Sequence, residues 1–210
     1  MTIFTVATED ILGENYKLTK IECSDYNPNI DGNITVTITV TDVYEDPIEG
    51  ENVTVTASEG TFTQLNGSDI TSDSSVTGTT NSSGQFTLTY NCSEWGLITF
   101  TANNTSTQVH VTGWREITAG TGKLWVNDET KTAVFYFTRT GAITTEISYS
   151  NAIPSGYRPY SAVRMIAHNS TGAVTKVGVE GDGTVRLTSS SYSSTSVTVA
   201  CQITYAYGVQ

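Results

Sequence analysis

Few side chains in this 210-residue chain could support acid–base or metal chemistry. His110 and His168 are its only histidines, and neither has a Cys or His partner at the spacing of a zinc site. Adjacent carboxylates occur in three predicted turns: Glu9/Asp10, Glu45/Asp46 and Asp128/Glu129. Glycoside hydrolysis instead needs two carboxyl groups facing each other across a cleft. The sequence also lacks a Gly-X-Ser-X-Gly motif and a phosphate-binding glycine loop, so we expect no enzyme activity, metal or cofactor.

A second set of side chains has the chemistry of saccharide recognition. Aromatic rings stack on sugar C–H groups, while charged and amide groups bind hydroxyls. The candidate ligand-binding residues lie close together in the sequence: Tyr157, Arg158, Tyr160, Arg164, His168 and Asp182. Two other interpretations stay open, because tyrosines in β domains commonly pack in the core or between subunits, and a histidine before a turn is commonly structural.

The predicted elements around these residues would hold them in place. Pro154 and Pro159 stiffen the loop at 153–160 and favour extended backbone at Ile153 and Arg158. An apolar strand is expected at 163–168, followed by a turn at 169–172 and a second strand at 173–179. A tight Gly-Asp-Gly hairpin at 181–183 then leads to a third strand at 184–188. We predict that a double replacement of Tyr157 and Arg158 weakens binding without unfolding the protein.

Period-two alternation runs through most of the chain and predicts an all-β fold. At 34–40, Ile and Val alternate with Thr, and similar patterns recur near 53–55, 85–90, 98–102 and 109–111. A one-residue slip among Leu18, Ile21 and Cys23 predicts a bulged first strand. The composition shifts after Thr112, where Trp114 opens a more aromatic half. We therefore expect a lead-in segment at 1–15, one β-sandwich at 16–112 and a second antiparallel sandwich at 113–210, with Trp125 in its core.

The strand at 133–137 (AVFYF) is apolar on both faces. Such a strand needs cover on both sides, and a second subunit commonly provides it. We expect a homo-oligomer, with a trimer as the specific prediction, and expect residues 114–210 alone to oligomerise.

Net charge limits the classes of partner. The chain carries a formal charge of −11 with only ten Lys and Arg residues. It has no basic patch to displace counterions from a phosphate backbone or an anionic bilayer, so we expect neither nucleic acid nor membrane insertion. The run Glu45, Asp46, Glu49 and Glu51 lacks the spacing of a calcium loop and is interpreted as a solvated turn.

Signals for the cellular compartment disagree. The N-terminal residues have neither a basic region nor a long apolar run, which indicates synthesis without a secretory signal. Cys201 alternates with core positions and is expected to be buried, while a Cys23–Cys92 bridge is less expected than two free thiols. Eight Asn-X-Ser/Thr triplets would suit a secreted glycoprotein, although this composition produces them by chance. They begin at Asn33, Asn52, Asn66, Asn81, Asn91, Asn103, Asn104 and Asn169.

Three blocks in the first half carry a family resemblance. Residues 40–55 (VTDVYEDPIEGENVTV), 79–88 (TTNSSGQFTL) and 96–102 (GLITFTA) resemble, in this order, the bacterial immunoglobulin-like domain of the invasin and intimin type. The resemblance covers about residues 16–112. It implies a rigid spacer or stalk, occasionally a contact module, without catalytic residues.

The second half resembles another class. Residues 153–159 (IPSGYRP), 169–172 (NSTG), 177–185 (VGVEGDGTV) and 203–205 (ITY) resemble the head domains of bacteriophage tail-fibre and baseplate receptor-binding proteins. Ile153 replaces the usual leucine, and the tail beyond Tyr205 is longer. The resemblance implies a virion protein, made in the host cytoplasm beside other tail proteins, that binds a host cell-surface saccharide or cell-wall polymer. The alternative is a cellular surface adhesin with an immunoglobulin-like stalk.

Overall fold

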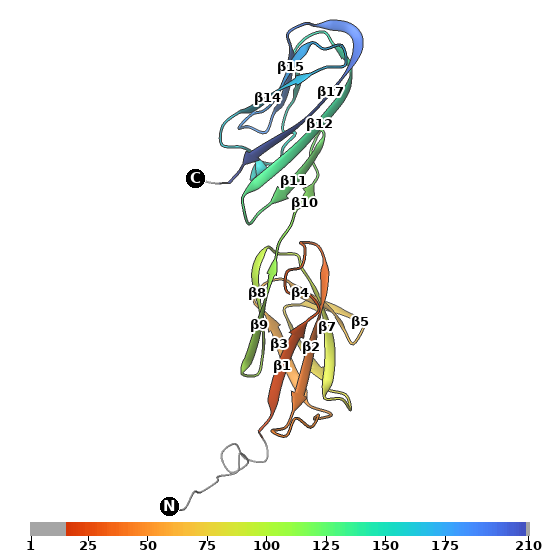
Figure 1. The fold of residues 1–210 in the computed structure, drawn as a ribbon, viewed down its shortest axis with the longest axis vertical. Coiled ribbons are helices and arrows are strands. Elements are labelled where there is room, and N and C mark those ends of the chain that lie inside the picture. Colours follow the sequence, from red (N-terminus) through yellow and green to blue (C-terminus); the bar gives the residue numbers. More distant parts are fainter. Residues whose placement is uncertain (1–15, 209–210) are drawn as a thin grey trace, which may run out of the picture. The chain divides into compact units, whose positions relative to one another are not determined.

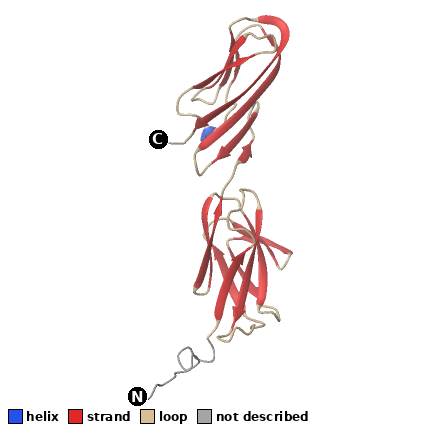
Figure 2. Ribbon diagram, in the orientation of Figure 1, coloured by secondary structure: helices blue, strands red, loops and turns tan. Residues whose placement is uncertain are grey.

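The computed structural model describes residues 16–208, and its regular structure is almost entirely β-strand (Figures 1 and 2). The chain divides into two compact units at Thr112/Gly113, which we call unit 1 and unit 2. The prediction of an immunoglobulin-like β-sandwich followed by a second antiparallel sandwich is confirmed. The expected lead-in segment at 1–15 lies outside the described residues. Over residues 16–208, no helix has the length and apolar character needed to span a bilayer.

Unit 1 packs a five-stranded sheet against a four-stranded sheet (Figure 1). The five-stranded sheet has the order β1-β2-β7-β4-β5, with β1 (Leu18–Cys23), β2 (Asn33–Thr41), β7 (Gln85–Asn91), β4 (Thr61–Leu65) and β5 (Ser68–Asp73). The four-stranded sheet has the order β6-β3-β8-β9, with β6 (Ser75–Thr79), β3 (Asn52–Ala57), β8 (Gly96–Ala102) and β9 (Thr105–Val111). All named pairs are antiparallel.

Alternation builds the core of unit 1 as the sequence predicts. Ile34, Val36, Ile38 and Val40 of β2 are all buried, while the threonines between them face outward. Between the sheets, the rings of Phe62, Tyr90 and Phe100 pack with centroids 4.9–5.8 Å apart. The Tyr90 hydroxyl donates to the Glu59 carbonyl at 2.8 Å, so this buried polar group keeps a hydrogen-bond partner.

The first strand corrects one prediction. β1 pairs with β2 in an unbroken register from Leu18↔Thr41 to Cys23↔Val36, so the expected bulge is wrong. Leu18 is 43% exposed, because it lies on the outer face of β1 rather than in the core pattern.

Beyond β1 the chain forms parallel contacts with the end of β9. The amide of His110 donates to the Tyr26 carbonyl at 2.8 Å, and the amide of Thr112 donates to the Pro28 carbonyl at 3.0 Å. The Ile30 amide in turn donates to the Thr112 carbonyl at 2.7 Å. These three bonds, which we call the 26–112 clamp, fasten the last residues of unit 1 to the segment that follows its first strand.

Unit 2 consists of two four-stranded sheets and the 3₁₀ turn η1 (Ser155–Tyr157). The β12 sheet has the order β10-β11-β12-β17, with β10 (Arg115–Ile117), β11 (Lys123–Asn127), β12 (Thr132–Ile143) and β17 (Ser193–Ala206). The β15 sheet has the order β13-β16-β15-β14, with β13 (Ile147–Tyr149), β16 (Val185–Ser189), β15 (Val174–Val179) and β14 (Val163–His168). The expected 181–183 hairpin joins β15 to β16 and is confirmed.

The β12 sheet buries one face and leaves the other open. Ala133, Phe135 and Phe137 are buried, whereas Tyr136 is 41% exposed and Val134 half-buried. Trp125 pairs with Val134 on this outer face, with the Lys123 ammonium 5.5 Å from its ring centroid. The prediction that Trp125 lies in the core is therefore wrong. Within this single chain, the second apolar face of the strand has no protein cover among the described residues.

The three cysteines are free thiols. Cys92 and Cys201 are buried and Cys23 is half-buried, which confirms the expectation for Cys201. Burial raises the pKa of each thiol to about 11, and the neighbouring Cys92 adds to the rise at Cys23.

Candidate ligand-binding face

The 153–160 loop is held by internal bonds rather than by its prolines alone. Arg158 has extended backbone, as predicted (φ −77°, ψ 142°). Its Nε donates to the Ile153 carbonyl at 3.0 Å and its Nη2 donates to Asn151 Oδ1 at 3.1 Å. The guanidinium of this candidate binding residue therefore closes the loop on itself.

The hairpin after β15 packs directly against this closure. The Ile153 amide donates to the Gly183 carbonyl at 3.0 Å. Gly183 has a φ of +82°, and a Cβ there would lie 2.4 Å from Arg158 Nε and 2.5 Å from the Ile153 oxygen. Asp182 Oδ1 accepts from the Thr184 amide at 2.8 Å, and hydrogen bonds from Thr184 lower the Asp182 pKa below its ordinary value.

The two candidate tyrosines have different surroundings. Tyr157 packs edge-on against Tyr207, with ring centroids 5.3 Å apart. Tyr160 is 61% exposed and borders a shallow hollow of about 630 Å³, which we call the loop hollow. Its lining residues are Ser155, Gly156, Arg158, Pro159, Tyr160, Gly181 and Gly208.

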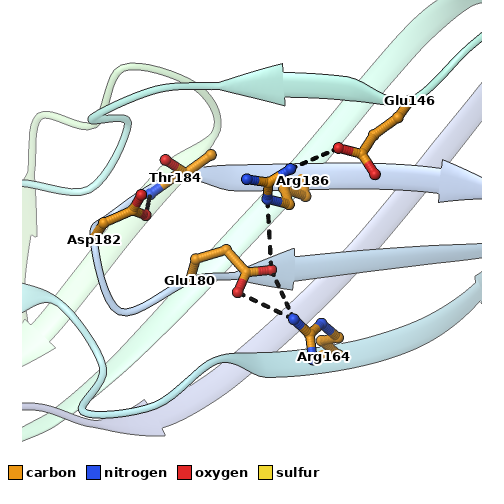
Figure 3. A network of polar contacts seen from close by, with 6 residues as sticks. All are labelled: Glu146, Arg164, Glu180, Asp182, Thr184 and Arg186. Atoms are coloured by element: carbon orange, nitrogen blue, oxygen red, sulfur yellow. Dashed lines mark hydrogen bonds and ion pairs between the residues drawn. The ribbon is translucent and has the colours of Figure 1, made fainter.

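A row of charged side chains crosses the outer face of the β15 sheet (Figure 3). The register aligns Arg164 of β14 with Gly178 of β15 and Arg186 of β16. Arg164 Nη2 donates to both carboxylate oxygens of Glu180 at 3.1 Å, and Arg186 Nη1 donates to Glu146 Oε1 at 2.6 Å. Arg186 Nε lies 3.9 Å from Glu180 Oε1, so one carboxylate lies between two guanidinium groups.

Two adjoining hollows lie along this face. The larger, of about 330 Å³, is lined by Glu146, Arg164, Lys176, Gly178, Glu180, Arg186 and Thr188. The smaller, of about 160 Å³, is lined by Val174, Lys176, Thr188, Ser189 and Ser190. Because they share Lys176 and Thr188, we treat them as one feature, the β15 groove.

The structure separates the residues predicted from the sequence. Arg164 lies in the β15 groove, while Arg158 and Tyr160 border the loop hollow. Tyr157 packs against Tyr207, and Asp182 accepts the Thr184 amide within the hairpin, so both side chains have partners inside unit 2. His168 ends β14, where its Nδ1 lies 3.1 Å from the Gly172 carbonyl across the turn.

Sequence reasoning missed the other charged groups of the groove: Glu146, Lys176, Glu180 and Arg186. A signal for some of them was present. A hairpin centred on 181–183 pairs Gly178 with Arg186 and Lys176 with Thr188, and period-two alternation then places Lys176 and Arg186 on the same face. Glu146 gave no such signal, because it precedes β13, which pairs with β16 across a long connection.

The described residues do not assemble a metal site. Across residues 16–208, no three His, Cys, Asp or Glu side chains gather closely enough to hold a metal ion. The polar groups of the β15 groove form ion pairs and donate hydrogen bonds, an arrangement that can bind a polar ligand by contact.

No protein-family model and no curated protein matches the chain. Among solved structures, domains 4 and 5 of the S-layer protein SbsC match at 21% identity, covering 46% of each chain, with a TM-score of 0.29. The Yersinia pseudotuberculosis adhesin InvE matches at 13% identity over 91% of this chain and 59% of its own, with a TM-score of 0.35. The chain thus spans about half the length of these two structures.

A further similarity is to the C-terminal 282-residue fragment of intimin, solved with the intimin-binding domain of its translocated receptor. It has 15% identity over 90% of this chain and 63% of that fragment, with a TM-score of 0.29. Because these TM-scores are below 0.5, the assignment of two β-sandwiches rests on the strand order and register given above.

Proposed function

We propose that this chain is a non-enzymatic recognition protein that binds a saccharide or cell-wall polymer on a cell surface. Unit 1 acts as an immunoglobulin-like spacer, and unit 2 carries the binding face. The β15 groove carries this proposal: it is an open sheet face with charged and hydroxyl groups set at fixed cross-strand spacing. Polar side chains on a rigid sheet can bind sugar hydroxyls without reorganising.

We assign the protein first to the cellular adhesins. The order of the three invasin-like blocks supports this assignment, since they contribute residues to β3, β7 and β8 of one sandwich. A virion receptor-binding protein is the second candidate. The sequence patterns at 153–159 and 177–185, which resemble phage head domains, support it, and they form the loop closed by Arg158 and the hairpin bonded to that loop. Immunolabelling of intact cells and of purified virus particles distinguishes the two locations.

The primary test is binding of the labelled full chain to purified prokaryotic cell envelopes and to a panel of their extracted polysaccharides. We expect saturable binding to at least one polymer, with no oligosaccharide released during prolonged incubation. If no envelope or polymer binds, the recognition role is wrong. Release of oligosaccharide would instead indicate a hydrolase.

Tyr160 offers a clean test of the loop hollow. A double replacement of Tyr157 and Arg158 would also loosen the loop, because both side chains have partners within unit 2. Tyr160→Ala removes an exposed ring without disturbing these contacts. We expect weaker polymer binding and unchanged thermal stability if the loop hollow contributes to binding.

We also propose that the protein assembles as a homotrimer through the outer face of the β12 sheet. Trp125, Val134 and Tyr136 form an apolar strip there, and several copies would give several binding sites in one particle. Multiple weak sites bind a repeating polymer far more tightly than one site does.

A further inference from the structure

The β15 groove concentrates positive charge in an acidic protein. The whole chain has a formal charge of −11 and ten Lys and Arg residues. Three of them, Arg164, Lys176 and Arg186, line a single hollow of about 330 Å³. Only two carboxylates, from Glu146 and Glu180, face them in this hollow. One positive charge therefore remains in excess where the rest of the surface is mainly negative.

Several donors of the groove face solvent without a hydrogen bond to another protein group in the described part of the chain. Arg164 uses Nη2 for Glu180, and Arg186 uses Nη1 for Glu146. Among residues 16–208, the structure gives no hydrogen-bond partner to Arg164 Nε and Nη1, to Arg186 Nη2 or to Lys176 Nζ. These groups can only donate, so an anionic group that replaces their water offers them acceptor atoms of opposite charge.

Glu180 pairs with both arginines and orients them, which leaves Lys176 as the cation of the groove without a carboxylate partner among residues 16–208. Glu180 has a side chain only 17% exposed and lies between Arg186 and Arg164, and it accepts two hydrogen bonds from Arg164 Nη2 (Figure 3). Gly178 lies between the two arginines in the register, and a Cβ there would approach Arg164 Cγ to 3.1 Å. The same Cβ would lie 3.6 Å from Glu180 Oε1, so the Glu180 carboxylate occupies the space above Gly178 between the two guanidinium groups.

We propose that the β15 groove binds an anionic polysaccharide, with one acidic group at Lys176, the lining cation that has no carboxylate partner among residues 16–208. This inference rests on the proposed function and specifies the ligand class. The smaller hollow continues the path over Val174 and Thr188, and it adds the hydroxyl of Ser190 as a partner for a sugar hydroxyl. A repeating acidic polymer fits this arrangement, because the groove offers charged and neutral polar positions in succession.

The experiment measures binding of the full chain to three probes: polygalacturonate as a carboxylate polymer, poly(glycerol phosphate) as a phosphate polymer and dextran as a neutral one. We expect an anionic probe to bind more tightly than dextran, with an affinity that falls as ionic strength rises. The stronger of the two anionic probes identifies whether the natural acidic group is a carboxylate or a phosphate.

Two substitutions in the groove, one removing a positive charge and one removing a negative charge, locate the site. Lys176→Gln removes an exposed cation and should weaken binding of the anionic probe about two- to fivefold, while Glu146→Gln should strengthen it by a similar factor. Lys20→Gln, an equal charge change at an exposed position of unit 1, should leave the affinity unchanged. A folding defect cannot produce a gain at Glu146 and a loss at Lys176 together.

The outcomes separate this inference from the proposed function. Tighter binding of dextran, or equal affinity of the parent and Lys176→Gln for the anionic probes, overturns the anionic site but leaves polymer recognition in place. Binding to cell envelopes without binding to either anionic probe has the same meaning. If neither envelopes nor probes bind, the recognition role itself fails.

Discussion

Gly183 is a single residue on which the loop closure depends. Its positive φ and its close approach to Arg158 and Ile153 both exclude a side chain. We expect Gly183→Ala to lower the free energy of unfolding by about 1–3 kcal/mol, because backbone strain and steric overlap add. Urea unfolding of the full chain measures this change.

Gly172 provides a matched control, since its φ is +84° but nothing lies within 4 Å of a Cβ there. Gly172→Ala should cost only the conformational strain, about 1 kcal/mol. If the two variants lost equal free energies of unfolding, the close packing of Gly183 against Arg158 would contribute no stability.

The cysteines make stability depend on alkaline pH. Their pKa values of about 11 lie above the ordinary value of 9.0, so the unfolded chain releases these protons first. Below about pH 9 the thiols are protonated in both the folded and the unfolded state, and they do not make stability depend on pH. Between about pH 9 and 11 only the unfolded state loses these protons, so the free energy of unfolding falls as the pH rises. Urea unfolding across this range should give a falling free energy of unfolding, with a shallower slope for Cys201→Ala. A parallel slope for that variant would contradict the burial effect at Cys201.

Arg158 illustrates what the sequence could and could not predict at a single residue. Neighbouring prolines predicted its extended backbone, which is a local property. Its bond to Ile153 and its contact with Gly183 depend on a hairpin about twenty-five residues away, so the chain alone indicated an exposed binding group. Lys176 is the opposite case, because the hairpin register could have placed it in the groove.

At the scale of the element, β12 carries the core of unit 2 on one face only. Phe135→Ala should lower the free energy of unfolding by about 3–5 kcal/mol, since the buried ring leaves a cavity. Tyr136→Ala, on the next residue and the outer face, should cost under about 1 kcal/mol in a monomer. Urea unfolding of both variants at low protein concentration tests this difference. Similar losses would indicate that the outer face is buried in solution.

Alternation predicted the elements better than it predicted their faces. It identified β2 and its four buried residues correctly, because both neighbours of that strand pair along its length. It failed at Leu18, which is apolar but faces outward, and Trp125 and Ile166 are two further apolar residues on outer faces. Ile166 is 65% exposed on β14, at the edge of its sheet. An apolar side chain on an outer face obeys the same period as a buried one, so the pattern could not distinguish them.

At the scale of the whole molecule, the proposed trimer depends on the open face of the β12 sheet. We expect the full chain to be a trimer in light scattering, and Tyr136→Lys to reduce it to a monomer, because a charge would be buried at the contact. Ile166→Lys, on the other sheet of unit 2, should keep the parent mass. A monomeric parent chain would reject assembly and leave the outer strip for another partner.

The 26–112 clamp has a mechanical consequence if the protein holds a cell surface, as proposed. The bonded segments run parallel, with the Asn29↔Thr112 bridge between them. A pull on the chain beyond Thr112, resisted at the start of unit 1, drags the two segments past each other along their length. The three bonds are then sheared together instead of being unzipped one at a time. Unit 1 would thus resist extension under flow or drag most strongly in the direction in which an attached surface applies tension.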